Sequence, residues 1–194
     1  MLKMKTLALA AVTLCAGSAV CAQTVRPVIG AALSGGGETL VTVQMTNGNE
    51  QRVSSGGLLH FYGGVEYREN AESRLTIQAT VGYHVDDSGA DNGKVSFSRV
   101  PFELLAFWNQ NPQWRFGGGL RKTSSAKLEG SGVASDIGEV NMTTDVGAVV
   151  QAEYFFGEQA STYVRLVSER YKSARLNGGS VNGDHIAIGM AYRF

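Results

Sequence analysis

The sequence is poor in the residues that usually staple or interrupt a small domain. Its 194 residues include three prolines and two cysteines, and both cysteines, Cys15 and Cys21, lie near the N-terminus. The rest of the chain cannot form a disulfide, so its stability needs another source. Basic and acidic residues balance at 17 each. Without a basic excess to neutralise phosphates, a nucleic-acid partner is not expected.

Long apolar runs are also missing after residue 22, so no transmembrane helix is predicted there. Before it, Lys3 and Lys5 precede a short apolar stretch that ends at Val20-Cys21-Ala22. This pattern predicts a secretory signal peptide over 1–22 and a single mature domain over 23–194. A lipoprotein site at Cys21 is the alternative, although such sites have a small residue where Val20 stands.

The mature chain does contain alternation of apolar and polar residues with period two, which is typical of β-strands. In the last segment, for example, Ile186, Ile188 and Met190 fall on one face. Short connections alternate with long polar ones, and Asn47-Gly48 in the first long connection predicts an extra hairpin. Eight segments show the alternation: 26–33, 59–68, 74–85, 99–108, 114–121, 142–156, 162–171 and 184–194.

Period two alone does not separate a soluble barrel from a membrane barrel. The apolar faces mix alanine and glycine with larger residues, whereas a soluble core needs dense large side chains. Aromatic residues gather at the strand ends next to the short connections, as in an interfacial girdle. The sequence therefore predicts an all-β fold, an eight-stranded antiparallel up-and-down transmembrane β-barrel. The girdle residues are Tyr67, Trp108, Trp114, Tyr154, Phe156, Tyr192 and Phe194.

The C-terminus carries a more specific pattern. Gly189, Tyr192 and the terminal Phe194 resemble the assembly signal of bacterial outer-membrane proteins, with Ala187 where a polar residue is usual. With eight strands and a signal peptide, the mature chain resembles the small outer-membrane β-barrel superfamily of the OmpA transmembrane domain and OmpX. The resemblance implies Sec-type export to the outer membrane of a Gram-negative bacterium. It also implies contact with the barrel-assembly machinery, outer-membrane lipid and lipopolysaccharide, and a possible external ligand at the loops.

The opposite face of the strands carries charges of both signs. An eight-stranded barrel has room for little beyond its own side chains, so these charges are expected to pair inside it. Arginines outnumber acids eight to five on this face, which leaves open a narrow, slightly anion-favouring lumen. Nine residues form the predicted lumen network, namely Glu66, Arg68, Arg99, Glu103, Arg115, Arg121, Glu153, Arg165 and Glu169, and Arg26, Arg74, Asp145 and Arg193 share their face.

Other candidate sites are weaker. The lipid A deacylases of this size carry a His-x-Ser-Asn-type motif, but the nearest segment here is Tyr171-Lys172-Ser173-Ala174, without the histidine. His60, His84 and His185 are expected to be separate hydrogen-bonded interior groups rather than metal ligands. No catalytic residue, metal site or cofactor is predicted. Acidic residues of the long connections are expected to form a solvated rim, with divalent-cation binding near lipopolysaccharide as the alternative. They are Asp86, Asp87, Asp91, Asp136, Glu139 and Asp184.

These features together predict a barrel with a polar, largely plugged lumen. The expected role is structural, or one of surface interaction or adhesion through the loops. A narrow channel for small or hydrophobic solutes is the alternative, and a lipid A-modifying enzyme is a third possibility. Fold alone does not decide among these roles.

Overall fold

The computed structural model describes residues 25–44, 50–90, 93–132, 135–174 and 179–194. The expected signal segment, 1–22, therefore lies outside the described residues. The described chain is almost entirely β-strand, with one short 3-10 helix at Ser135–Ile137. None of its helical turns is long and apolar enough to cross a membrane.

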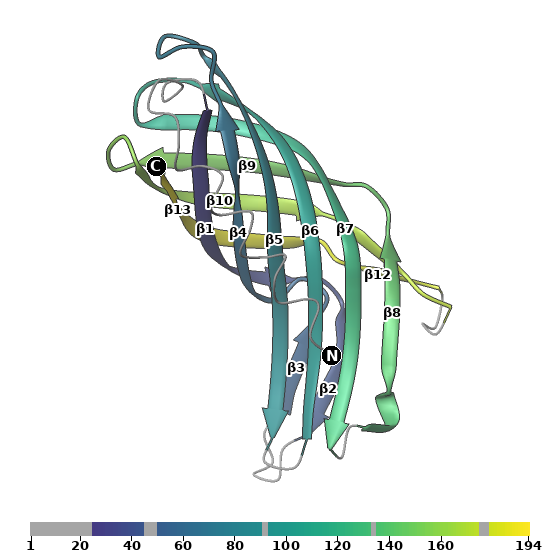
Figure 1. Cartoon of the computed structure of the whole chain (residues 1–194). Coiled ribbons are helices and arrows are strands. Elements are labelled where there is room, and N and C mark those ends of the chain that lie inside the picture. Colours follow the sequence, from purple (N-terminus) through teal and green to yellow (C-terminus); the bar gives the residue numbers. More distant parts are fainter. Residues whose placement is uncertain (1–24, 45–49, 91–92, 133–134, 175–178) are drawn as a thin grey trace, which may run out of the picture.

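Eight antiparallel strands close into a barrel, which confirms the predicted fold (Figure 1). Each predicted segment contains a barrel strand, but two of them are broken. Segment 142–156 is divided between β8 Glu139–Thr144 and β9 Gly147–Phe155, and segment 162–171 between β10 Ala160–Ser168 and β11 Arg170–Lys172. The barrel closes because β1 pairs with the last strand, from Val28 opposite Arg193 to Gly36 opposite His185. Closure gives every strand two neighbours and leaves no open edge. In order around the barrel the strands are β1 Val25–Gly36, β4 Leu58–Tyr67, β5 Leu75–Ala90, β6 Gly93–Asn109, β7 Trp114–Gly132, β9 Gly147–Phe155, β10 Ala160–Ser168 and β13 His185–Arg193.

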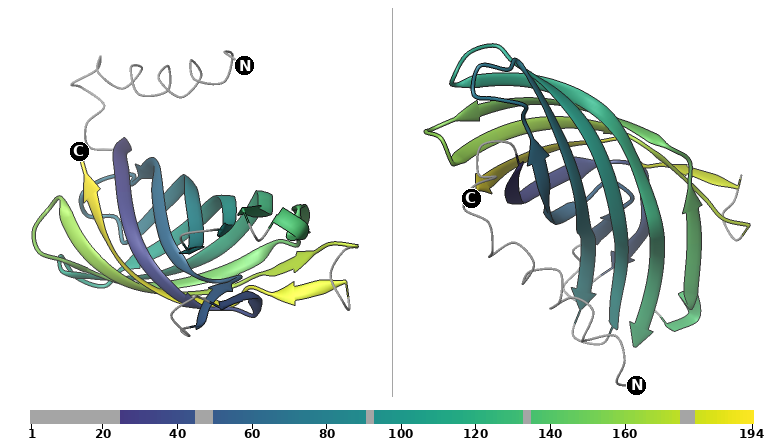
Figure 2. Two further views of the ribbon diagram at one scale, coloured as in Figure 1. Left: turned by 90° about the horizontal axis from the view of Figure 1, so that it is seen from below. Right: turned by 45° about the horizontal axis from the view of Figure 1, so that its top comes forward.

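At one end, strands of the barrel continue beyond it and are joined by shorter strands. We call this part of the molecule the extension. The distal parts of β5, β6 and β7 run past the barrel, and shorter strands join them (Figure 1). The predicted hairpin forms there, although its turn residues Asn47 and Gly48 lie outside the described residues. The β11–β12 hairpin projects from the side (Figure 2). The short strands are β2 Thr39–Gln44, β3 Glu50–Ser54, β8 Glu139–Thr144, β11 Arg170–Lys172 and β12 Ser180–Asn182.

The polarity of the two faces inverts where the barrel meets the extension. On β6, Val95 and Phe97 point inward within the extension, whereas Glu103 points inward within the barrel. The outward face changes in the opposite sense, from Lys94 to the exposed Phe102. The extension therefore has the apolar interior of a soluble protein, and the barrel has the apolar exterior of a membrane protein.

Two irregularities lie at the same level of the sheet. Between β6 and β7 the register shifts, so that Ser124 and Ser125 of β7 are both exposed and the alternation changes phase. Next along the wall, β8 ends at Thr144 and β9 begins at Gly147, and the alternation changes phase again. Such a bulge re-aims the side chains that follow it. Apolar residues that share one phase point outward in the barrel. Beyond each break, residues of that same phase point inward in the extension.

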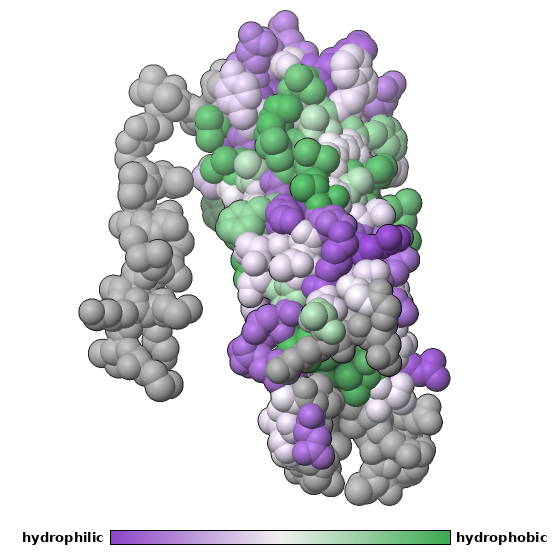
Figure 3. Space-filling view, turned by 90° about the vertical axis from the view of Figure 1, so that its right-hand side faces the viewer, coloured by the Kyte–Doolittle hydropathy of each residue, from purple (hydrophilic) through white to green (hydrophobic). Residues whose placement is uncertain are grey.

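An apolar belt surrounds the barrel. In one side view it lies between polar residues at the short-turn end and polar residues near the middle of the molecule (Figure 3). Aromatic rings of the belt touch one another at the short-turn end. Ring centroids lie 5.0 Å apart for Trp114 and Tyr154 and 5.1 Å apart for Tyr192 and Phe194. Large apolar side chains of the belt include Ile29, Leu33, Phe61, Val65, Val81, Tyr83, Phe102, Leu104, Phe116, Leu120, Val150, Val164, Leu166, Ile186, Ile188 and Met190.

Candidate functional site: a filled lumen

The first layer of the lumen, at the short-turn end, joins two arginines to two glutamates. Arg115 donates to Glu153 from Nε and to Glu66 from Nη1, both at 2.8 Å. Arg193 donates to Glu66 from Nε at 2.9 Å and to Glu153 from Nη2 at 2.6 Å. Each carboxylate therefore holds both guanidinium groups, and the four side chains form a closed ring of opposite charges. Such pairing and hydrogen bonding are what make buried charge tolerable.

Neutral groups complete this first layer. Ser161 donates to Glu153, and Gln78 accepts from Arg115 at 3.2 Å. The rings of Phe107 and Phe155 lie 4.0 and 5.1 Å from the guanidinium carbon of Arg115. A guanidinium interacts favourably with the face of an aromatic ring, so these two rings stabilise the buried charge of Arg115.

The second layer centres on Glu103. Its carboxylate accepts from Arg121 at 2.6 Å and from Arg165 at 2.8 Å. Arg165 also donates from Nε to Gln151 at 2.8 Å, and its guanidinium lies beside the rings of Tyr62 and Tyr163. Arg121 and Arg165 are at most 1% exposed, so the middle of the barrel holds fixed protein charges.

A third layer lies below the extension. Arg121 reaches Glu169 from Nε at 3.1 Å, and Glu169 also accepts from the hydroxyls of Tyr171 and Thr123. Arg99 donates to the Tyr171 hydroxyl at 3.3 Å and to the carbonyl of Gly57. Through Arg121 the second and third layers form one continuous set of hydrogen bonds.

The structure brings together eight of the nine predicted lumen residues, all except Arg68. Arg68 lies at the barrel mouth, where it donates to the carbonyls of Ser73 and Ala71 in the adjoining turn. The end of a strand is accessible to water, and the adjoining turn offers carbonyl groups without partners. A residue there can therefore be in phase with the inward face and still not be buried. Placing Arg68 in the network was therefore wrong.

Three of the four further residues on the predicted face also lie outside the lumen. Arg26 donates to backbone carbonyls at the short-turn end, and Arg74 is exposed over the ring of Trp108. Asp145 is exposed because it falls in the break between β8 and β9, where the alternation changes phase. Arg193, in contrast, is a full member of the first layer.

The charge balance of the lumen follows from these placements. Within the described residues, five arginines and four glutamates are buried, and Asp86 adds a fifth buried carboxylate. Asp86 accepts the backbone N–H of Ser54 at 2.8 Å and interacts electrostatically with Arg99. The excess of arginine in the sequence thus belongs to the rim, and the buried charges balance.

The three histidines lie in the interior, as predicted, but the expectation that they are separate was wrong. His60 and His84 are cross-strand partners with ring centroids 5.1 Å apart, and His84 and His185 lie 5.2 Å apart across the narrow lumen. His84 hydrogen-bonds Ser34 at 2.7 Å and contacts Arg121, and His185 contacts the carbonyl of Gly183. Across the described residues, no three acidic, histidine or cysteine side chains converge as metal ligands.

Glycines make the space that the inward rings occupy. A Cβ placed on Gly30 would lie 2.3 Å from Tyr62, and one on Gly189 would lie 2.5 Å from Tyr163. Gly117 receives Phe107 in the same way. These glycines are therefore required by close approach of rings, and not by an unusual backbone angle.

The extension closes the far end of the lumen. Beneath the β2–β3 hairpin, Val53, Phe97 and Tyr171 are completely buried, and the rings of Phe97 and Tyr171 meet edge to face at 5.3 Å. Phe97 also covers the guanidinium of Arg99 at 4.8 Å. The charged layers therefore end under a dry apolar core, whose members are Val53, Val95, Phe97, Ala126, Leu128, Val140, Met142 and Tyr171.

Comparisons with known proteins identify similar folds. No family model and no curated protein sequence matches the chain. Among solved structures, Ail of Yersinia pestis, crystallised with the heparin analogue sucrose octasulfate, superposes with a TM-score of 0.54. It is 12% identical, and the match covers 89% of this chain and 99% of Ail. The chain has the fold of the small eight-stranded outer-membrane β-barrels.

Two further barrels match with lower scores. Neisserial surface protein A has a TM-score of 0.45 and 10% identity, with coverage of 88% of this chain and 97% of the other. OprG from Pseudomonas aeruginosa has a TM-score of 0.39 and 13% identity, with coverage of 89% and 96%. With TM-scores below 0.5, these two matches carry no argument about function.

The residues of the predicted assembly signal lie on two faces of β13 and at the residue that follows it. Gly189 points inward against Tyr163, while Tyr192 and Phe194 are exposed in the belt at the short-turn end. This placement gives Gly189 a packing role in the folded barrel. Recognition of the three residues by an assembly machinery stays a prediction.

The segment that most nearly matches the deacylase motif contributes to the interior. Tyr171 is buried, and its hydroxyl donates to Glu169 and accepts from Arg99. Lys172 is exposed and paired with Asp145. The residue at the histidine position of that motif therefore supports the lumen network, and the expectation that the protein is not an enzyme stays a prediction.

Proposed function

We propose that the protein is a closed, non-conducting barrel of the bacterial outer membrane with a structural or surface-interaction role. The observation that carries the proposal is the buried network of arginines and glutamates, in which Gln151 joins the first layer to the second. Gln151 donates to Glu153 at 3.0 Å and accepts from Arg165 at 2.8 Å. An ion that followed the barrel axis would have to displace fixed, paired charges and then the apolar core of the extension. A narrow channel has no comparable support from these contacts.

The orientation we propose places the short turns in the periplasm and the extension outside the cell. Small outer-membrane barrels have short periplasmic turns and longer external segments. The exposed face of the extension is polar, and its charges pair, as in Lys127 with Glu129 and Glu139. An external ligand would meet this face, which is why we assign the interaction role to the extension.

Export and insertion follow the same proposal. The leader over 1–22 would direct Sec-type export, and Gly189, Tyr192 and Phe194 would present the last strand to the barrel-assembly machinery. In the membrane the belt contacts lipid and lipopolysaccharide. No cofactor, nucleic-acid partner or catalytic activity is part of the proposal.

Planar-bilayer recording tests the closed lumen. The sample is purified protein whose folded state is shown by a shift in gel mobility on heating. It is expected to give no stable conductance steps, because paired side chains of the described residues fill the barrel. A general porin inserted into the same bilayer is the positive control. Reproducible, ion-selective steps from the folded protein would refute the closed barrel and support the narrow-channel alternative.

A further inference from the structure

Four exposed charged side chains gather where the belt meets the extension on the β7–β9–β10 side. Lys172 pairs with Asp145, Nζ to Oδ2, at 2.6 Å. Lys122 donates to the carbonyl of Thr144, next to Asp145, and the Asp145 N–H donates to the Arg170 carbonyl at 3.3 Å. Three cations and one carboxylate thus meet at the break between β8 and β9; we call this set the basic junction.

The junction keeps a positive excess. A hydrogen bond from Lys172 lowers the pKa of Asp145 below its usual value, and the charges of Lys172, Lys122 and Arg170 add to this effect. Lys172 is used by the pair, but Arg170 has no carboxylate within ion-pair distance among the described residues. A further exposed carboxylate, Asp184, lines the same polar depression as Arg170, and it accepts the backbone N–H of Glu169 at 3.0 Å. Three cations therefore face two carboxylates, both already hydrogen-bonded.

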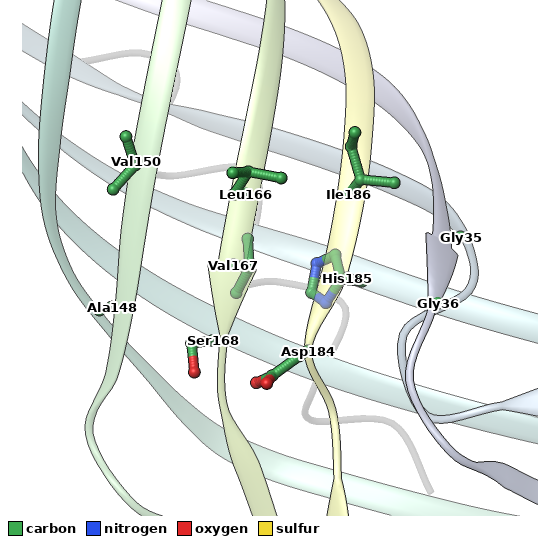
Figure 4. Close-up of a pocket in the computed structure, with 10 residues that line it drawn as sticks. All are labelled: Gly35, Gly36, Ala148, Val150, Leu166, Val167, Ser168, Asp184, His185 and Ile186. Carbon is green, nitrogen blue, oxygen red and sulfur yellow. The ribbon is translucent and has the colours of Figure 1, made fainter.

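An apolar depression lies directly beside this charge. It is a shallow groove of about 490 Å³ on the outside of β9, β10 and β13, floored by exposed Val150, Leu166 and Ile186 (Figure 4). Ser168 and Asp184 border it and also line a polar depression that contains Asp145 and Arg170. Apolar and cationic surfaces are therefore continuous across the edge of the belt.

We propose that this junction binds one phosphorylated lipid of the outer leaflet. Its phosphate contacts Arg170 and Lys122, and an acyl chain lies along Val150, Leu166 and Ile186. A guanidinium and an ammonium suit phosphate oxygens, and the edge of the belt is the level at which lipid headgroups lie. A soluble phosphate would leave the adjoining groove unused, so a lipid is the occupant that matches both halves. The inference rests on the membrane placement proposed above.

Native mass spectrometry of the folded full-length mature protein in a neutral detergent tests the site. The probes are diphosphorylated lipid A, the same lipid without phosphates, and inorganic phosphate. The test variant is Lys122→Gln with Arg170→Gln. The matched control is Arg74→Gln with Lys94→Gln, which removes the same charge from exposed positions at the opposite edge of the belt and on the extension.

The test variant is expected to bind diphosphorylated lipid A about tenfold more weakly or worse, as the loss of two charge-assisted contacts implies, while the control variant binds as the wild type does. Inorganic phosphate should not displace the lipid at equal concentration. Equal binding of lipid with and without phosphate, equal loss in both variants, or displacement by inorganic phosphate would each overturn the site. Conductance is measured on the same sample. Loss of lipid binding without conductance would refute the lipid site alone, whereas conductance steps would refute the closed barrel.

Discussion

Replacing Glu153 with glutamine is expected to lower the free energy of unfolding by about 3–5 kcal/mol, the usual cost of breaking a buried ion pair. Glu153 is fully buried and accepts hydrogen bonds from Arg115, Arg193 and Ser161. Its loss leaves two buried guanidinium groups sharing the single carboxylate of Glu66. Urea unfolding of protein refolded into lipid vesicles measures the change.

Two companion variants separate the network from glutamate chemistry in general. Glu139→Gln removes an exposed carboxylate paired with Lys127 and should change stability by about 1 kcal/mol or less. The double variant Glu153→Gln with Arg193→Gln restores equal numbers of opposite charges in the first layer and should recover part of the loss. If Glu153→Gln costs no more than Glu139→Gln, the first layer does not hold paired buried charge.

Replacing Phe97 with alanine is expected to destabilise the extension by about 3–5 kcal/mol, the usual cost of truncating a buried phenylalanine. Phe97 is completely buried, meets the ring of Tyr171 and covers Arg99. The substitution opens a cavity above the third layer and exposes its charges. Amide exchange in the distal parts of β6 and β7 should become on the order of a hundredfold faster, or more, because opening becomes easier.

Phe102→Ala is the matched control, since it lies on the same strand but is exposed in the belt. It should leave amide exchange within the extension unchanged, whatever it does to membrane insertion. Wild-type exchange rates in Phe97→Ala would show that the apolar core does not stabilise the extension.

The barrel could be predicted from the sequence because one solvent acts on each face. Within the belt the outward positions of the eight strands are mostly apolar, so Ile186, Ile188 and Met190 alternate strictly with inward residues. The turns and closure then follow from the need to pair every backbone group. For the same reason, the central lumen residues Glu103, Arg121 and Arg165 could be found from alternation alone.

The extension could not be predicted as a separate apolar core, because outside the belt the faces exchange polarity. The signal was present on β6, where Val95 and Phe97 share the inward face with Arg99 and Glu103. The alternation changes phase at Ser124-Ser125 and again at Asp145-Val146. A search for strict period-two alternation does not reveal such a change, because a bulge adds one residue without any distinctive sequence. That is why Asp145 was assigned to the wrong face. The burial of Asp86 was missed for another reason, because β5 keeps its alternation past His84 into a segment that was expected to be an exposed connection.

Contacts between side chains on opposite sides of the lumen could not be predicted either. Arg68 and Arg193 both lie near strand ends with the same inward phase, yet only Arg193 meets a carboxylate. His84 and His185 come from strands that are not neighbours and still lie 5.2 Å apart, because an eight-stranded barrel is narrow. Contacts of this kind depend on stagger and diameter, which a single sequence does not specify.

Hydrogen exchange of arginine side chains tests the filled lumen most directly. Four Nε–H groups donate within the network: Arg115 to Glu153, Arg121 to Glu169, Arg165 to Gln151 and Arg193 to Glu66. In NMR spectra of the folded protein these protons should exchange on the order of a hundredfold more slowly, or more, than that of exposed Arg74. Exchange of all four at the rate of Arg74 would show a water-filled lumen and contradict the closed barrel.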